Sequence, residues 1–171
     1  RVTPRSELLE GVSWAVANGA KVVSVSYSEV EFADVQAAGG LARSAGSHLV
    51  WSAGNSNSDW SSFDHTKVTI VGGTTQSDER WVSGLNGSGY GRAVDIYAPC
   101  TQVYTTRKAG LYGNAPSGVS FAVPQVAAAL ALLSERLPTA SPELIEQLML
   151  WRSFDLGVPG RDEEFGWGRL N

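Results

Sequence analysis

One segment changes from a helix pattern to a strand pattern within a few residues: SELLEGVSWAVANGAKVVSVSY, residues 6–27. Apolar residues first recur at the spacing of one helix face, at Leu8, Leu9, Val12, Ala15 and Val16. Asn18-Gly19 is a helix stop signal. The valines at 22, 23 and 25 then predict a strand over residues 21–27 that is buried on both faces.

The same alternation continues to the end of the chain. It predicts a helix over residues 31–46, strands over 48–51, 67–71 and 93–97, a hairpin over 103–113, and helices over 119–137 and 141–151. Gly72-Gly73 and Pro99 are expected to end strands. Helices that alternate with apolar strands predict an α/β fold, a parallel sheet flanked by helices. Residues 1–171 show no linker or internal repeat, so we expect one domain or a large piece of one.

Composition excludes several classes of protein. Hydrophobic residues make up 43% of the 171 residues and charged residues 18%, which excludes a disordered chain. The formal charge of −4 argues against a nucleic-acid partner, because no basic excess is available to neutralise phosphates. No apolar run approaches the ~20 residues of a membrane helix, so no membrane partner is expected. The chain does not start with Met, and we expect it to be a processed or excised segment.

Two polar residues follow apolar or glycine-rich segments at positions suited to chemistry. Ser120, within SGVSFAVP at residues 117–124, lies where a glycine turn meets an apolar helix. A serine there presents its hydroxyl and an unpaired backbone N–H, although an ordinary N-cap has the same pattern. Asn55 follows an apolar strand in a Gly-Asn-Ser turn, where its amide suits either an oxyanion donor or a turn residue.

Together these motifs resemble the C-terminal half of the catalytic domain of a subtilisin-like serine protease (subtilase, peptidase S8 family). Ordered matches run nearly from end to end, at residues 6–18, 22–26, 50–55, 94–99, 118–127 and 165–171. One segment resembles the family motif Gly–Thr–Ser–x–Ala–x–Pro–His–Val–Ala most specifically. It reads Gly118-Val119-Ser120-Phe121-Ala122-Val123-Pro124-Gln125-Val126-Ala127. The resemblance implies part of the three-layer subtilisin-like fold.

The resemblance also implies a role for each matched residue. Ser120 would attack a peptide bond and form an acyl-enzyme, and Asn55 with the Ser120 N–H would stabilise the oxyanion. Two short segments would form the walls of the primary specificity pocket and pair with a polypeptide substrate: Ser26, Tyr27 and Ser28, and Ser52, Ala53 and Gly54. The implied function is that of a serine endopeptidase.

The family orders its triad as Asp, His and Ser, and the first two would lie upstream of this region. His48 and His65 do not match the family's histidine motif, so we predict that the chain alone is inactive. Two alternatives stay open. One is a pseudoprotease or protein-binding module that keeps the substrate groove. The other is a different serine hydrolase with a base recruited from His48 or His65.

The remaining expectations concern partners and cofactors. The missing N-terminal half of the domain is an expected partner, and an open sheet edge also favours a dimer or a swapped assembly. No cofactor or metal site is expected in this chain, whereas Ca²⁺ is expected in the longer protein through the resemblance. Extracellular localisation is likewise implied by the resemblance.

Two departures from the family pattern each allow two interpretations. Ser28-Glu29 replaces a family Gly-Gly, and Glu29 is either a solvated loop charge or a filter of substrate charge. Cys100 is either a buried thiol or half of a disulfide with the missing part.

Overall fold

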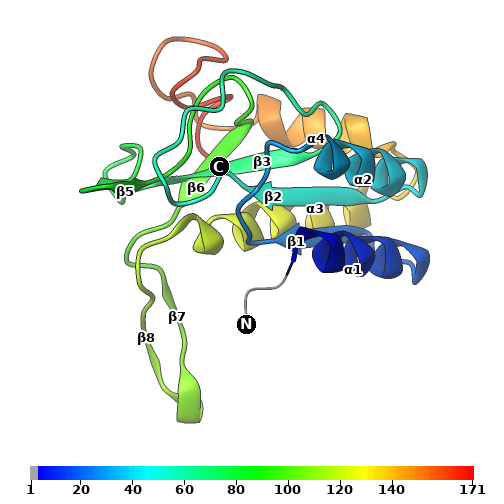
Figure 1. Ribbon diagram of the computed structural model, residues 1–171, viewed down its shortest axis with the longest axis horizontal. Coiled ribbons are helices and arrows are strands. Elements are labelled where there is room, and N and C mark those ends of the chain that lie inside the picture. Colours follow the sequence, from blue (N-terminus) through cyan, green and yellow to red (C-terminus); the bar gives the residue numbers. More distant parts are fainter. Residues whose placement is uncertain (1–3) are drawn as a thin grey trace.

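A computed structural model describes residues 4–171 and confirms the predicted α/β class (Figure 1). The predicted domain, residues 1–171, also includes residues 1–3, which lie outside the described residues. The main elements alternate along the chain as follows: α1 (Arg5–Ala17), β1 (Val22–Val25), α2 (Ala33–Ser44), β2 (His48–Ser52), β3 (Thr69–Thr74), β6 (Ile96–Pro99), α3 (Val123–Arg136) and α4 (Pro142–Trp151).

The main sheet of the described residues has four parallel strands in the order β1-β2-β3-β6. Val22 of β1 is in register with His48 of β2, and Val50 of β2 with Thr69 of β3. Because the strands are parallel, their carboxyl ends meet at one edge of the sheet. The segments that follow β1 and β2 therefore lie side by side, and this edge is where a site is expected.

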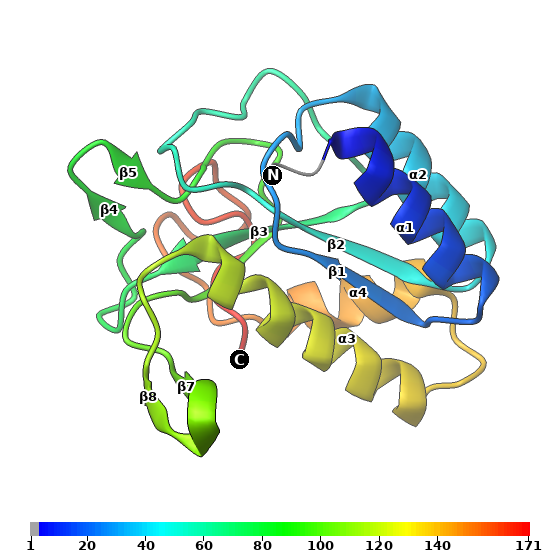
Figure 2. The same cartoon turned by 60° about the horizontal axis from the view of Figure 1, so that its bottom comes forward.

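Helices cover both faces of the sheet and make three layers (Figures 1 and 2). Successive side chains of β2 point to opposite faces, as a strand requires. Leu49 and Trp51 belong to the apolar core shared with α1 and α2, whereas Val50 belongs to the core shared with α3 and α4. This explains why the strands read as continuous apolar runs.

The prediction that Gly72-Gly73 ends a strand is wrong. β3 runs on to Thr74, with Gly72 in register with Tyr97. A Cβ atom at Gly72 would overlap the Tyr97 ring, and one at Gly73 would overlap the Cys100 side chain. The glycines therefore permit close packing inside the sheet instead of a turn.

Cys100 is fully buried and forms no disulfide within the described chain. Burial raises the pKa of its thiol to about 12, so the thiol stays protonated at neutral pH.

The strand predicted over residues 93–97 lies later in the chain, at Ile96–Pro99. The Asp95 carboxylate accepts the Ile70 N–H at 2.8 Å, so a side chain takes the place of a strand carbonyl just before β6. Pro99 is the last paired residue, in register with Thr74, and does not lie beyond the strand.

The helix predicted over residues 119–137 is divided in two. A single 3₁₀ turn, η2 (Val119–Phe121), comes before α3. Pro124 lies in the first turn of α3, where the missing N–H is not needed. Ser120 therefore lies on a short turn between Gly118 and the helix.

Two antiparallel hairpins project from this frame. One joins β4 (Val82–Ser83) to β5 (Asn86–Gly87). The predicted hairpin is the other one and joins β7 (Tyr104–Thr106) to β8 (Tyr112–Asn114) through the 3₁₀ turn η1 (Lys108–Gly110). Figure 1 shows this second hairpin extending away from the sheet just before η2.

Two neighbouring glycines of α2 should respond oppositely to alanine. A Cβ atom at Gly39 would lie 2.5 Å from Cγ2 of Val68 and would overlap the Lys67 carbonyl, whereas Gly40 has no atom within 4 Å of that position. We expect Gly39→Ala to lower the free energy of unfolding by about 1–3 kcal/mol through overpacking. We expect Gly40→Ala to raise it by about 1 kcal/mol, since alanine is the better helix former. Urea unfolding measures both, and equal effects would contradict the packing of α2 described above.

Candidate active site

A cavity of about 250 Å³ lies at the carboxyl edge of β1 and β2. Its lining comes from three separate parts of the chain: Ser26, Tyr27, Ser28, Ser52, Gly54, Asn55, Ser56 and Ser120. Seven of the eight residues predicted for the site line it. The eighth, Ala53, is buried, and its carbonyl accepts the Trp60 indole N–H at 2.8 Å.

Sequence reasoning missed Ser56, although its position directly after Asn55 was a usable signal. The lining carries no Asp, Glu, Lys, Arg or His side chain.

The turn η2 presents two free groups of Ser120. The Ser120 carbonyl accepts the Ser26 hydroxyl at 3.1 Å, which ties the turn to the end of β1. The Phe121 N–H donates to Gly118 at 3.0 Å, and the Ala122 N–H to Val119 at 2.8 Å. Within residues 4–171, neither Oγ nor the backbone N–H of Ser120 makes a hydrogen bond. Both groups are therefore free of partners within the described chain.

The Asn55 amide has a defined orientation. Its Oδ1 accepts the Val119 N–H at 2.8 Å. A backbone N–H can only donate, so this bond directs Oδ1 toward Val119 and leaves Nδ2 as the free donor. Gly54, with φ +82°, makes the turn that places Asn55, and its N–H donates to the Ser52 hydroxyl at 3.0 Å. The residue before Ser120 thus orients the candidate oxyanion donor.

The loop after β1 is anchored from two sides. The Trp51 indole N–H donates to the Ser28 carbonyl at 3.1 Å. Arg5 at the start of α1 forms an ion pair with Glu29 at 2.9 Å and with Asp34 at 3.0 Å. Glu29, which has φ +63°, is therefore an ion-pair partner that holds the loop, a role that neither sequence-based alternative named.

Neither histidine lines the Ser120 cavity. His48 begins β2, at the opposite end of the sheet from the carboxyl edge, where burial and then the Arg43 charge lower its pKa to about 4. His65 is buried in the loop before β3, with its ring 4.7 Å from the Phe63 ring. The alternative of a base recruited from His48 or His65 has no geometric support.

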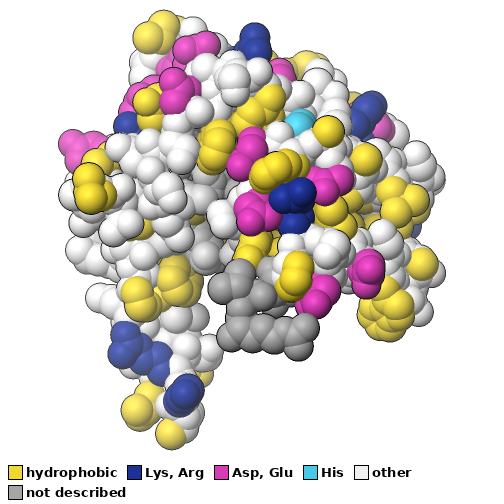
Figure 3. All heavy atoms as spheres, in the orientation of Figure 1, with side chains coloured by type: hydrophobic (Ala, Val, Ile, Leu, Met, Phe, Trp, Pro, Cys, Tyr) yellow, Lys and Arg dark blue, Asp and Glu magenta, His cyan; other side chains and the backbone are white. Residues whose placement is uncertain are grey.

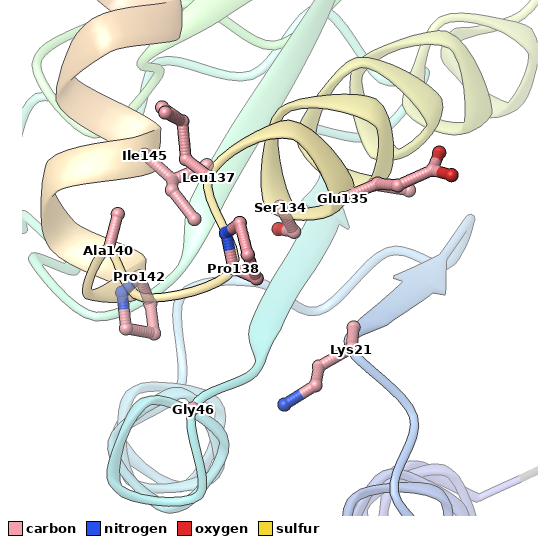
Figure 4. A pocket seen from close by; sticks show the side chains of 10 residues that line it. Lys21, Gly46, Ser134, Glu135, Leu137, Pro138, Ala140, Pro142 and Ile145 are labelled. Carbon is pink, nitrogen blue, oxygen red and sulfur yellow. The ribbon is translucent and has the colours of Figure 1, made fainter.

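A second cavity, of about 300 Å³, lies at the amino ends of the strands, between the ends of α2 and α3 and the start of α4 (Figure 4). Leu137, Pro138 and Ile145 make part of its wall, and Lys21 and Glu135 flank it. The hydroxyl of Ser134 donates to the Leu130 carbonyl at 2.7 Å, so it is not a free nucleophile.

In residues 4–171 no three His, Cys, Asp or Glu side chains gather closely enough to hold a metal ion. No helix among those residues has the length and apolar character needed to span a membrane.

The fold and the cavity first define a class. A serine at the start of a helix, beside an amide donor at the carboxyl edge of a parallel sheet, is the arrangement of a candidate serine hydrolase. Comparison with known proteins then gives the family. A profile of the subtilase family, Peptidase S8, matches residues 3–168. The chain belongs to the subtilase family of serine proteases.

Individual relatives agree with this assignment. The chain is 31% identical to alkaline serine exoprotease A of Vibrio alginolyticus, over 86% of this chain and 28% of that protein. It is 32% identical to the extracellular serine proteinase of Thermus sp. (strain Rt41A), over 85% of this chain and 36% of that protein. The chain thus spans about a third of the length of these relatives.

Solved structures show the same fold. MycP1 from Mycobacterium smegmatis superimposes with a TM-score of 0.77 at 21% identity, over 96% of this chain and 52% of that chain.

Proposed function

We propose that this chain is the C-terminal portion of a subtilisin-like catalytic domain and supplies the nucleophile and oxyanion site of a serine endopeptidase. One observation carries the proposal. In a single cavity, Ser120 has a free hydroxyl and a free N–H, while the Val119 N–H directs the Asn55 amide so that Nδ2 is a free donor. Membership of the subtilase family supports the same assignment.

In this proposal Ser120 Oγ attacks the carbonyl carbon of the scissile peptide bond. The hydroxyl proton passes to a general base and then to the leaving amine as the C–N bond breaks, which leaves an acyl-enzyme on Ser120. Asn55 Nδ2 and the Ser120 N–H donate to the oxyanion that forms in between. Water then cleaves the ester by the reverse of these proton transfers.

The walls of the cavity bind the acyl side of the substrate. Ser26, Tyr27 and Ser28 pair with the substrate as an added strand, opposite Ser52 and Gly54. Ala53 supports this wall from behind, because its N–H donates to the Val71 carbonyl at 2.9 Å and its carbonyl accepts the Trp60 indole N–H.

The general base comes from outside residues 1–171 in this proposal, because neither histidine lines the cavity. β1 is the terminal strand of the described sheet, and its outer edge would pair with the N-terminal half of the domain. The chain alone is then inactive, and without that half the edge favours a dimer or a swapped assembly.

Two further parts of the proposal concern location and cofactors. One relative is named an extracellular proteinase, and we propose that this protein also acts outside the cell. The proposed chemistry requires no cofactor, and Ca²⁺ in the longer protein stays a prediction.

A fluorophosphonate probe, read by intact mass and peptide mapping, tests the proposal. We expect no label on the chain alone, since Ser120 there has no general base. We expect a label on Ser120 in the longer protein that carries this chain. A label on the chain alone would show that the base lies within residues 1–171. No label on either would favour the pseudoprotease or protein-binding module that keeps the groove.

A further inference from the structure

A groove distinct from the two cavities described above is lined in part by the turn η2, which carries the candidate nucleophile. It has a volume of about 680 Å³ and is formed between the β7–β8 hairpin and Phe121, the residue after Ser120. Leu111 of the hairpin and Pro116, which follows β8, add apolar wall. Sequence reasoning assigned no role to this hairpin, because only its return toward η2 turns it into a wall.

The Ser120 cavity and the hairpin groove are lined by consecutive residues of the turn η2. They share no lining residue: Ser120 lines the first, and Phe121 lines the second. In the proposed function the Ser120 cavity binds the acyl side of the scissile bond. A polypeptide that crosses Ser120 would then continue along the hairpin with the residues that follow the cleaved bond.

The hairpin groove is basic in an acidic protein. Arg107 and Lys108 line it, and residues 101–117 contain no Asp or Glu, whereas the whole chain has a formal charge of −4. Figure 3 shows Lys and Arg side chains gathered on the projecting hairpin, with hydrophobic side chains beside them at its tip.

Arg107 and Lys108 differ in whether their charged groups have partners within the protein. Arg107 donates to the Asn114 carbonyl across the hairpin, which holds the guanidinium against β8. Lys108 is exposed and makes no ion pair or hydrogen bond with any described side chain, so its ammonium is free to meet an anion. The Tyr104 and Tyr112 rings stack 6.2 Å apart and connect the two strands that carry these cations.

We propose that the hairpin groove binds the part of a polypeptide substrate that follows the cleaved bond, and that Arg107 and Lys108 favour acidic side chains there. This inference rests on the proposed function. The apolar wall holds the substrate chain, and the cations select its charge. Because the cations lie at the surface, their attraction weakens as ionic strength rises.

Paired peptides test the inference in the longer protein that carries this chain. Each pair has the same residues before the scissile bond and either Asp and Glu or Asn and Gln after it. We expect kcat/KM to be about threefold higher for the acidic member per ion pair made, the size of an exposed pair at low salt. That ratio should fall toward one in 0.5 M NaCl.

Lys108→Glu should reverse the preference for the acidic peptide. Arg136→Glu is the matched control: it makes the same charge change at the far end of α3 and should leave the preference unchanged. An equal rate on both peptides, or an unaltered ratio in Lys108→Glu, would overturn the inference while peptide cleavage stands. Absence of cleavage of every peptide, with no fluorophosphonate label, would instead overturn the proposed function, and this inference with it.

Discussion

Replacing Ser120 by alanine, in the longer protein that carries this chain, should lower kcat for peptide hydrolysis by about 10⁶-fold. This is the size of loss known for a subtilisin without its nucleophile. The reason is that no other hydroxyl in the cavity lies on the turn η2, where an oxyanion donor is at hand. Initial rates on a chromogenic peptide measure the effect.

The same substitution should leave stability almost unchanged. Ser120 Oγ makes no hydrogen bond within residues 4–171, and the carbonyl that accepts the Ser26 hydroxyl belongs to the backbone. We therefore expect the free energy of unfolding to stay within about 0.5 kcal/mol of the wild-type value. Ser44→Ala on the exposed side of α2 is the control and should keep full activity. Activity within tenfold of wild type in Ser120→Ala would mean that another group is the nucleophile.

Substitutions of Asn55 should separate the roles of its two polar side-chain atoms, Nδ2 and Oδ1. Asn55→Ala removes the free Nδ2 donor, and we expect kcat to fall by about 10²- to 10³-fold, the range known for removing this kind of donor from a subtilisin. It also removes Oδ1, which leaves the buried Val119 N–H without its acceptor. That unpaired group should cost about 1–3 kcal/mol of stability.

Asn55→Asp is the matched variant because it keeps an oxygen for the Val119 N–H and replaces only the donor. We expect its thermal unfolding to match that of the wild-type protein while kcat falls at least as far as in Asn55→Ala, since a carboxylate repels the oxyanion. Wild-type activity in Asn55→Asp would contradict the oxyanion role. An equal loss of stability in both variants would contradict the bond between Asn55 and Val119.

Some errors of sequence reading came from residues whose meaning depends on distant neighbours. Gly72-Gly73 has the local pattern of a turn, yet the Tyr97 ring and the Cys100 side chain occupy the space that the absent Cβ atoms leave. For Glu29 the sequence allows a solvated loop charge or a filter of substrate charge but not an ion pair that holds the loop, because its partner Arg5 lies 24 residues earlier. Local propensity cannot register such contacts.

The sequence by itself determined the class of the fold, the family, and the candidates Ser120 and Asn55. These depend on short-range properties: the periodicity of apolar residues and the order of residues in compact motifs. Only the tertiary structure decided which atoms are left free at the cavity. The Asn55 amide is oriented by a bond to a residue 64 positions away, and the basic hairpin becomes a groove because it folds back beside Phe121. Both features depend on the packing of segments far apart in the chain. That packing orients the Asn55 side chain and positions the hairpin, and no local pattern encodes either.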